Sequence, residues 1–320
     1  MEAVLEQIAK IGIVPVIKID RVEDAAPLAK ALSEGGLRCA EITFRTAAAE
    51  DSIRAMVKAL PDMLVGAGTV LTVEQLDKAA AAGAKFIVTP GFNPKIVEAA
   101  IKKGIPITPG CSSASDIEKA LEFGLDVVKF FPAEASGGLK AIKALAGPYP
   151  NVRFMPTGGI NAANLGEYLA FDKILACGGS WMVDPALIDA KDFAGITKLV
   201  REAVQSMLGF AVVHVGINCA GEKEADSVAK LFGLAFGFEY KAGSASIFAG
   251  KGVEVMKAPG LGVKGHIAIA TNSTERAIAF LESRGWKFRQ ETAKTDAKGR
   301  RIVIYLEEDF GGFAAHLVQR

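Results

Sequence analysis

The sequence predicts an α/β protein in which a (β/α)₈ TIM barrel is followed by a smaller α+β domain of paired βαβββ modules. The chain has 320 residues, and two domains are expected because single hydrophobic cores stop growing at roughly 250–300 residues. In residues 1–208, short β-branched or apolar runs alternate with Ala-rich segments of helical period, as in repeated βα units. Residues 209–320 instead carry strand-like runs and many glycines, which places the domain boundary near residue 209.

About eight βα units can be counted in residues 1–208, and eight is the number of units that closes a barrel. The predicted strands are Ile13–Ile17, Cys39–Phe44, Met63–Gly66, Phe86–Thr89, Ile105–Thr108, Val127–Phe131, Val152–Met155 and Ile174–Ala176. Segments of helical period lie between them and after them, including Ala25–Ser33, Glu74–Ala82, Ser115–Glu122 and Ala194–Met207.

The second domain contains an internal repeat. A strand-like run opens each half, at Val212–Ile217 and at Gly265–Ala270. Each run is followed by a helical segment, Ala225–Leu231 or Thr274–Ser283, and then by further strand-like runs. This order predicts two βαβββ modules, each of which needs the other to bury a sheet face.

Composition and charge exclude several classes of protein. The net charge is +1 and no basic run is present, so the electrostatic pattern of a nucleic-acid-binding protein is missing. The acidic segment Met1–Glu6 does not have the order of a signal peptide, and no apolar stretch approaches the ~20 residues of a membrane span. Four cysteines lie at no metal or redox spacing. We therefore expect a cytoplasmic protein without nucleic-acid or membrane partners, whose cysteines are small buried residues.

Lys129 is a candidate nucleophile because it lies within the apolar run Val127–Pro132. A buried ammonium group is costly, so such a lysine tends to lose its proton and become the free amine that attacks a ketone. The alternative is a structural lysine whose head extends to solvent at the end of the strand.

The segment Glu41–Arg45 favours the catalytic interpretation. The two-residue period of a strand would place Glu41, Thr43 and Arg45 on one face and the two apolar residues on the other. Glu41 could then transfer protons, and Arg45 could bind a substrate carboxylate through its planar guanidinium group. The alternative is a salt bridge between Glu41 and Arg45, which would leave an interior lysine unexplained.

Two glycine pairs follow the last two predicted barrel strands. Thr157-Gly158-Gly159 follows the seventh strand, and Gly178-Gly179-Ser180 follows the eighth. Loops at these two places usually form the phosphate site of such barrels, because backbone N–H groups there can approach an anion. A single glycine pair would be a simple turn more often than a site, but two pairs at the two expected strands predict a phosphate site.

Residues 1–208 resemble the family of 2-keto-3-deoxy-6-phosphogluconate (KDPG) aldolases and 4-hydroxy-2-oxoglutarate (KHG) aldolases. The matching segments are Ile13–Ile17, Glu41–Thr46, Val65–Val70, Thr89–Gly91, Val128–Glu134, Pro156–Ile160 and Gly178–Trp181. The resemblance implies a class I aldolase, which forms an imine with its substrate and releases pyruvate and glyceraldehyde 3-phosphate from KDPG. It also extends to KHG, which would give pyruvate and glyoxylate.

The resemblance also implies roles for individual residues. Lys129 would form the imine with pyruvate, and Glu41 would be the general acid/base, acting through a bound water. The pyruvyl part would contact Arg45, Thr69, Pro90 and Phe131, and the distal phosphate would contact Thr157, Gly158, Gly159, Gly179 and Ser180. A homotrimer is implied, with no metal or cofactor for this step. A rival interpretation is a phosphate-binding epimerase or decarboxylase on the same barrel, but such enzymes use a metal or an acid pair, and the first domain has no histidine.

The second domain holds all three histidines of the chain. His214 and His266 lie at equivalent places in the strands that open the two modules, and His316 lies in the last strand-like run. Glu254 is the corresponding acidic residue at the end of the first module. Three imidazoles and a carboxylate suit a divalent transition metal. For each residue taken alone, a buried ring or an exposed strand carboxylate is the simpler interpretation.

Residues 210–320 resemble the vicinal-oxygen-chelate superfamily, which includes glyoxalase I, epimerases and extradiol dioxygenases, in module order and ligand placement. In the glyoxalase-like members the last ligand is usually a glutamate that also serves as the base, whereas His316 stands at that place here. The resemblance therefore implies metal binding but not isomerase chemistry. The alternative is a binding or assembly module that has lost its metal.

Overall fold

The structure is a computed structural model that describes residues 1–320. The chain divides into two compact units, Met1–Met207 and Leu208–Arg320, which are described separately. The division falls next to the boundary expected from the sequence.

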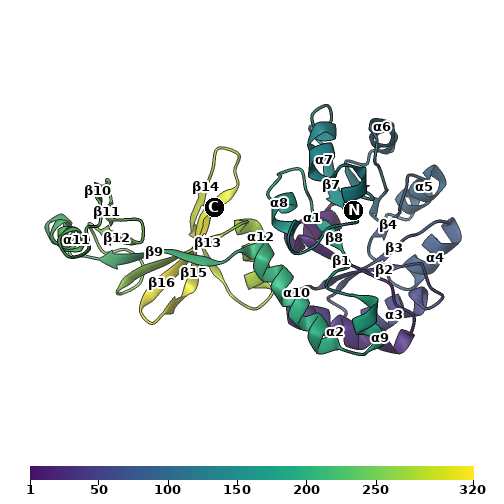
Figure 1. Cartoon of the computed structure of the whole chain (residues 1–320), viewed down its shortest axis with the longest axis horizontal. Helices are drawn as coiled ribbons and strands as arrows, with labels where there is room; N and C mark the ends of the chain where they lie inside the picture. Colours follow the sequence, from purple (N-terminus) through teal and green to yellow (C-terminus); the bar gives the residue numbers. More distant parts are fainter. The chain divides into compact units, whose positions relative to one another are not determined.

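The first unit is a barrel of eight parallel strands (Figure 1). The strands are β1 (Ile13–Ile17), β2 (Cys39–Thr43), β3 (Leu64–Gly68), β4 (Ile87–Val88), β5 (Ile107–Thr108), β6 (Val127–Phe130), β7 (Arg153–Pro156) and β8 (Cys177–Gly179). One ladder joins them in the order β5-β4-β3-β2-β1-β8, and a second ladder joins β6 to β7. Isolated bridges Gly110–Lys129, Phe154–Ile174 and Thr157–Gly178 close the ring between these two ladders.

The sequence located seven of the eight strands, but its eighth strand was wrong. The prediction was Ile174–Ala176, whereas β8 is Cys177–Gly179. Ile174 makes only a single bridge to Phe154, while Gly178 and Gly179 lie in the ladder with β1. Glycine has a low strand propensity and low hydropathy, so the sequence pattern favoured the apolar residues Ile174–Ala176 over Gly178 and Gly179. The second glycine pair thus lies within a strand rather than in the loop that follows it.

Helices surround the barrel strands, and those singled out from the sequence begin and end within two residues of the prediction. They are α1 (Glu2–Ile11), α2 (Ala25–Gly35), α3 (Ala49–Ala59), α4 (Val73–Ala81), α5 (Pro94–Lys102), α6 (Ala114–Glu122), α7 (Gly138–Ala146), α8 (Leu165–Leu169), α9 (Pro185–Asp189) and α10 (Phe193–Leu208), with short 3₁₀ turns η1 (Val22–Asp24) and η2 (Glu134–Ser136). Local caps fix several boundaries. For example, Ser113 and Asp116 form a reciprocal capping box at the start of α6.

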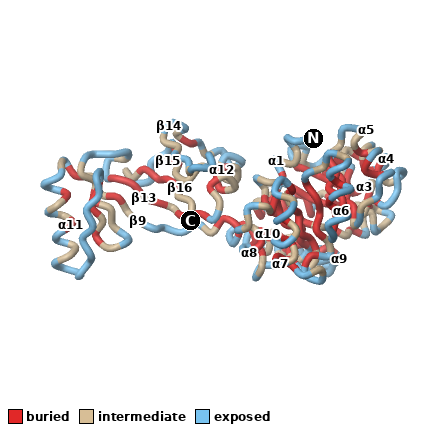
Figure 2. The backbone as a smooth tube through the Cα atoms, turned by 90° about the horizontal axis from the view of Figure 1, so that it is seen from above, coloured by how far each residue is buried: buried red, intermediate tan, exposed pale blue.

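The barrel interior is filled with apolar side chains, and Figure 2 shows the backbone of these buried residues in red at the centre of the barrel. Ile8 of α1 belongs to the same buried cluster as Val14, Cys39 and Leu64, which lie at the beginnings of β1, β2 and β3. Helix α1 therefore covers the N-terminal end of the barrel. The polar residues of a functional site are therefore expected at the opposite end, where the strands finish, as is usual for barrels of this kind.

The second unit is one eight-stranded sheet with two helices. Its elements are β9 (Ala211–Asn218), α11 (Glu222–Phe236), β10 (Tyr240–Ala242), β11 (Ser246–Ala249), β12 (Val253–Met256), β13 (Gly265–Thr271), α12 (Thr274–Glu282), β14 (Phe288–Thr295), β15 (Arg301–Phe310) and β16 (Phe313–Gln319). The order β-α-β-β-β therefore occurs twice. Strand order is β10-β11-β12-β9-β13-β16-β15-β14, and the two opening strands, β9 and β13, pair antiparallel at the centre.

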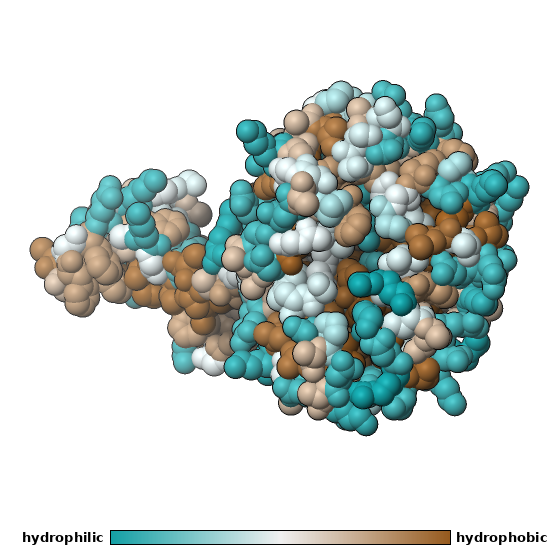
Figure 3. Space-filling view, turned by 45° about the vertical axis from the view of Figure 1, so that its right-hand side comes forward, coloured by the Kyte–Doolittle hydropathy of each residue, from teal (hydrophilic) through white to brown (hydrophobic).

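The two halves of this sheet are paired in the same way, since β9 runs parallel to β12 and β13 runs parallel to β16. Helix α11 packs on β11 and β12 through a small cluster that includes Ala225, Ala229 and Ile247. Its end leaves Leu231, Leu234 and Phe236 more than half exposed, and hydrophobic residues are visible on the surface of this unit in Figure 3. No helix of the structure combines the length and apolar character that a membrane crossing needs.

Candidate functional site

Lys129 lies inside the barrel near the end of β6, and its side chain is almost fully buried. Its backbone N–H donates to the carbonyl of Pro109, and its own carbonyl accepts from the N–H of Cys111. The Nζ atom lies 3.7 Å from Oε1 of Glu41 and 5.0 Å from the centre of the Phe131 ring. The structure therefore places the amine in the interior, and the alternative of a lysine extending to solvent is wrong.

Glu41 is completely buried on β2, and neither carboxylate oxygen has a hydrogen-bond partner. The Glu41 side chain has room only because residue 68 is glycine. A Cβ at position 68 would lie 2.7 Å from Cγ of Glu41. Burial raises the pKa of Glu41, and the nearby Lys129 only partly opposes this effect. A carboxyl group that retains its proton beside an amine is suited to acid/base catalysis.

Arg45 does not lie where the strand period predicted. Strand β2 ends at Thr43, so alternation holds for Glu41 and Thr43 only, and Arg45 is exposed in the following turn. The Thr43 hydroxyl is buried and donates to the carbonyl of Ile17 at 2.8 Å. No ion pair joins Arg45 to Glu41, so the salt-bridge alternative is wrong. The exposed guanidinium group makes no ion pair within the protein.

The other residues expected around a pyruvyl group follow the ends of neighbouring strands. Thr69, directly after β3, has a φ of 52°, which is uncommon for a residue other than glycine. Pro90 follows β4, and its carbonyl lies so close to Gly110 that a Cβ at position 110 would overlap it. Phe131 directly follows β6 and is partly exposed. Backbone strain of the kind seen at Thr69 is retained where the surrounding structure requires it, often at functional sites.

The turn after β7 presents backbone donors at the same end of the barrel. Gly158 and Gly159 have φ values of 95° and 86°, which glycine adopts at little cost. The backbone N–H groups of Gly159 and Ser180 have no acceptor within the protein and can bind an anion, whereas Gly158 adjoins the bridge between Thr157 and Gly178. Gly179 lies in β8 against the ring of Trp181, and a Cβ there would overlap that ring.

Two buried hydroxyl groups without partners lie on barrel strands or directly after them. The Thr157 hydroxyl, expected from the sequence, lies beside Gly178. The Thr108 hydroxyl on β5 was missed. Threonine is common in strands, so the run Ile105–Thr108 carries no signal that this hydroxyl would be buried without a partner.

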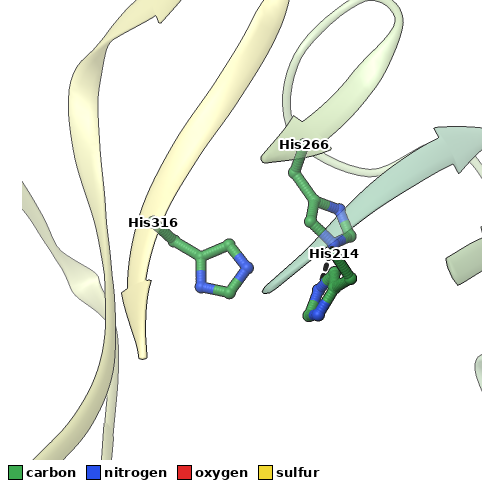
Figure 4. A group of neighbouring side chains, drawn as sticks. All are labelled: His214, His266 and His316. Atoms are coloured by element: carbon green, nitrogen blue, oxygen red, sulfur yellow. Dashed lines mark hydrogen bonds between the residues drawn. The ribbon is translucent and has the colours of Figure 1, made fainter. Parts of the chain in front are cut away.

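The second unit brings together the four residues proposed as metal ligands. One row of the sheet pairs Glu254 of β12 with Gly216 of β9, and Gly216 with His266 of β13. In a neighbouring row, Ala268 of β13 pairs with His214 of β9 on one side and with His316 of β16 on the other. The three histidines each offer a ring nitrogen within 4.8 Å of the others (Figure 4).

Glu254 completes this cluster. Its Oε2 lies 3.2 Å from Nε2 of His214 and 3.1 Å from Nε2 of His266. Hydrogen bonds from these two rings hold the pKa of Glu254 well below its usual range, whereas burial lowers the pKa of His316 to about 4. An ionised carboxylate and a neutral imidazole are the forms that bind metals, so the donor set fits a divalent transition metal.

Two neighbours of this cluster were not found from the sequence. The Ser246 hydroxyl donates to Oε1 of Glu254 at 2.6 Å, which fixes the orientation of the carboxylate. The Tyr305 ring packs against His316 with ring centres 4.6 Å apart. Both lie in strands whose pairing brings them to the cluster, and neither belongs to a recognisable motif.

Comparison with known proteins concerns the barrel. The family model for KDPG and KHG aldolases matches residues 4–199. The 2-dehydro-3-deoxy-phosphogluconate aldolase of Treponema pallidum is 53% identical over 205 residues, covering 64% of this chain and 98% of the relative. The KHG/KDPG aldolase of Escherichia coli K12 is 49% identical over 193 residues, covering 60% of this chain and 91% of the relative.

Solved structures agree with this result. A KDPG aldolase of Legionella pneumophila, with pyruvate captured as a covalent carbinolamine, has a TM-score of 0.61 and 40% identity over 62% of this chain and 97% of its own. The KDPG aldolase of Zymomonas mobilis ZM4 with 3-phosphoglycerate has a TM-score of 0.59 and 41% identity, covering 62% and 94%. With the buried Lys129–Glu41 pair at its centre, the chain belongs to the KDPG and KHG aldolase family.

Proposed function

We propose that the barrel is a class I aldolase that cleaves KDPG to pyruvate and glyceraldehyde 3-phosphate. The observation that carries the proposal is the Lys129 amine inside the barrel, 3.7 Å from a fully buried carboxyl group. The names of the relatives and the carbinolamine in the Legionella structure support the same chemistry. Membership of the aldolase family also disfavours the rival epimerase or decarboxylase.

The proposed reaction begins when the Lys129 amine attacks the C2 ketone and water is lost, which forms an iminium ion. The C4 hydroxyl then gives its proton to the Glu41 carboxylate through the bound water, the C3–C4 bond breaks to release glyceraldehyde 3-phosphate, and the electron pair of that bond forms an enamine at C2 and C3. Glu41, acting through a bound water, exchanges protons with the carbinolamine and returns a proton to C3. Hydrolysis of the resulting imine releases pyruvate and restores the amine.

The remaining barrel residues are proposed to hold the substrate, with no metal or cofactor taking part. Arg45, Thr69, Pro90 and Phe131 would surround the pyruvyl group. The distal phosphate would bind at Thr157, Gly158, Gly159, Gly179 and Ser180. The free N–H groups of positions 159 and 180 support this assignment, since backbone donors bind phosphate without a bulky side chain in the way.

A substrate panel with a Ser180→Asp variant tests this function. Wild-type chain should release pyruvate from KDPG far faster than from 2-keto-3-deoxygluconate, which is the same keto acid without phosphate, and cleavage of KHG would extend the activity. A carboxylate at position 180 repels the phosphate, so kcat/KM for KDPG should fall on the order of 100-fold. Pyruvate release is measured with a coupled lactate dehydrogenase assay.

The matched control is Ser180→Ala, which removes the hydroxyl without adding charge and should lose much less activity toward KDPG. With Ser180→Asp, kcat/KM for 2-keto-3-deoxygluconate should change less than about threefold. Equal losses on the two substrates would contradict the phosphate site. Failure of wild-type chain to cleave any member of the panel would contradict the aldolase itself.

We further propose that the second unit binds a divalent transition metal through His214, Glu254, His266 and His316. The row arrangement on the sheet and the short distances between donor atoms support this proposal. When bound, such an ion would supply Lewis-acid chemistry, while Ser246 orients the carboxylate.

Metal analysis of the full chain after incubation with Zn²⁺, Mn²⁺, Fe²⁺ or Ni²⁺ tests the metal site. We expect about one ion per chain for the wild type and at least tenfold weaker binding for His214→Ala, since one of four ligands is lost. Lys129→Ala is the control, because it alters only the barrel and should leave the bound metal unchanged. A wild-type chain that binds none of these ions would favour the alternative of a binding or assembly module, with which the exposed apolar residues of α11 are compatible.

The assembly of the barrel is also a proposal. The family resemblance implies a homotrimer, and Leu71, Val73 and Leu121 are large apolar residues exposed on the barrel that an interface could cover. Sedimentation of the full chain at several concentrations would measure the number of subunits.

A further inference from the structure

Glu134 is a carboxylate for which the proposed reaction has no use. It begins the turn η2, five residues after Lys129 on the chain segment that leaves β6. Its Oε1 accepts a short hydrogen bond from the hydroxyl of Tyr168 in α8. Tyr168 is 2% exposed, and a Cβ added at Gly138 would lie 3.1 Å from both Oε1 and the phenolic oxygen. A buried phenol therefore anchors the carboxylate.

The same glutamate supports the glycine turn after β7. A Cβ at position 159 would lie 2.5 Å from Cγ and 2.6 Å from Cβ of Glu134, so the turn rests directly on this side chain. The N–H of Glu134 donates to the carbonyl of Gly158 at 3.1 Å, and the N–H of Ala133 donates to that of Thr157 at 2.8 Å. These contacts tie the turn to the segment that carries Lys129.

The other side of the turn is also held. The carbonyl of Gly159 accepts from the side-chain amides of Asn161 at 3.2 Å and Asn164 at 3.0 Å. The three carbonyls of residues 157–159 thus accept hydrogen bonds, while the N–H group of Gly159 has no acceptor within the protein. The turn therefore presents a free backbone donor at Gly159 and no unpaired carbonyl, which is the arrangement that an anion requires.

A mobile Glu134 carboxylate would weaken anion binding at this turn. A negative charge beside an anion site weakens binding unless the charge is hydrogen-bonded and fixed in place. Tyr168 provides such a donor, and burial raises the pKa of its hydroxyl, so the proton stays on the phenol at neutral pH.

We propose that the Glu134–Tyr168 pair positions the Thr157-Gly158-Gly159 turn relative to Lys129 and thereby sets the preference for a substrate with a phosphorylated distal end. This inference rests on the proposed aldolase function. Both residues are positioning residues, because neither is placed in contact with the reacting carbon atoms.

Tyr168→Phe tests the proposal with the full chain and two substrates. Removing the donor frees the carboxylate beside the turn, so the KM for KDPG should rise about tenfold, the loss typical of one hydrogen bond to a charged group. The values of kcat for KDPG and kcat/KM for 2-keto-3-deoxygluconate should stay within about twofold, since neither depends on phosphate binding. Trapping of pyruvate by borohydride should be unchanged.

Glu134→Gln is the matched control, because it keeps an oxygen that accepts from Tyr168 and removes the charge. Its KM for KDPG should equal the wild-type value or lie below it. If Tyr168→Phe does not fold, Glu134→Ala replaces it as the test variant, because the Glu134 side chain is exposed and its loss should not prevent folding. Its KM should rise for KDPG alone.

Three outcomes would overturn the proposal: equal losses on both substrates, a loss in kcat alone, or a Glu134→Gln variant as impaired as Tyr168→Phe. These outcomes differ from failure of the aldolase function. In that case the wild-type chain itself would neither trap pyruvate nor cleave KDPG.

Discussion

Lys129→Ala is expected to abolish both the covalent trapping of pyruvate and the cleavage of KDPG. Reduction of wild-type chain with borohydride in the presence of pyruvate should leave one stable pyruvate-derived adduct, which mass spectrometry locates on Lys129. The variant should carry no adduct, and its kcat should fall on the order of 10⁴-fold or more, as on removing other enzyme nucleophiles. The physical reason is that the amine beside the buried Glu41 belongs to Lys129.

An exposed lysine of the same barrel provides the control. Lys140 of α7 is exposed and has no proposed role in the reaction, so Lys140→Ala should trap pyruvate and cleave KDPG like the wild type. An adduct that persists in Lys129→Ala would show that another residue is the nucleophile. It would also remove the basis for the proposed role of Glu41.

Glu41→Gln is expected to retain the adduct while losing turnover. The amide cannot exchange a proton with the bound water or the enamine, so kcat should fall about 10²–10⁴-fold. The imine can still form slowly, and borohydride should therefore label the variant during a long incubation. Unchanged turnover would show that another group moves the protons.

The same substitution should stabilise the fold in a pH-dependent way. Burial raises the pKa of Glu41 above its ordinary value of 4.5. The contribution of this carboxyl to stability is therefore fully present below about pH 4.5 and is lost as the pH rises through the folded-state pKa. The glutamine is never ionised, so the variant should gain stability over the wild type as the pH increases from that value.

Chemical denaturation at several pH values measures this difference in the free energy of unfolding. Glu122→Gln is the control, because Glu122 is exposed at the end of α6 and should give a difference within about 0.5 kcal/mol at every pH. We compare the free energy of unfolding of Glu41→Gln with that of the wild type at each pH. A variant whose advantage over the wild type is smaller at neutral pH than at pH 4.5 would contradict the raised pKa.

Strand limits show where local sequence patterns stop being informative. The run Cys39–Phe44 reads as one alternating strand, yet the ladder ends at Thr43 and Arg45 turns to the surface. The eighth strand was displaced onto Ile174–Ala176 for a similar reason. Hydropathy reports which residues are buried, whereas a strand is defined by hydrogen bonds to a neighbour that is distant in sequence.

The sequence by itself determined the alternation of strands and helices, the apolar run around Lys129, the glycine pair after the seventh strand and the clustering of the histidines in the second unit. These are local properties, because they depend on the residue types and spacing within one element. The tertiary structure alone decided that Glu41 meets Lys129 across the barrel, that Gly68 provides the space for Glu41, and that Glu254 lies between His214 and His266. Those distances follow from the closure of the barrel and the register of the second sheet, and register between distant strands is a property of the whole fold rather than of any one segment.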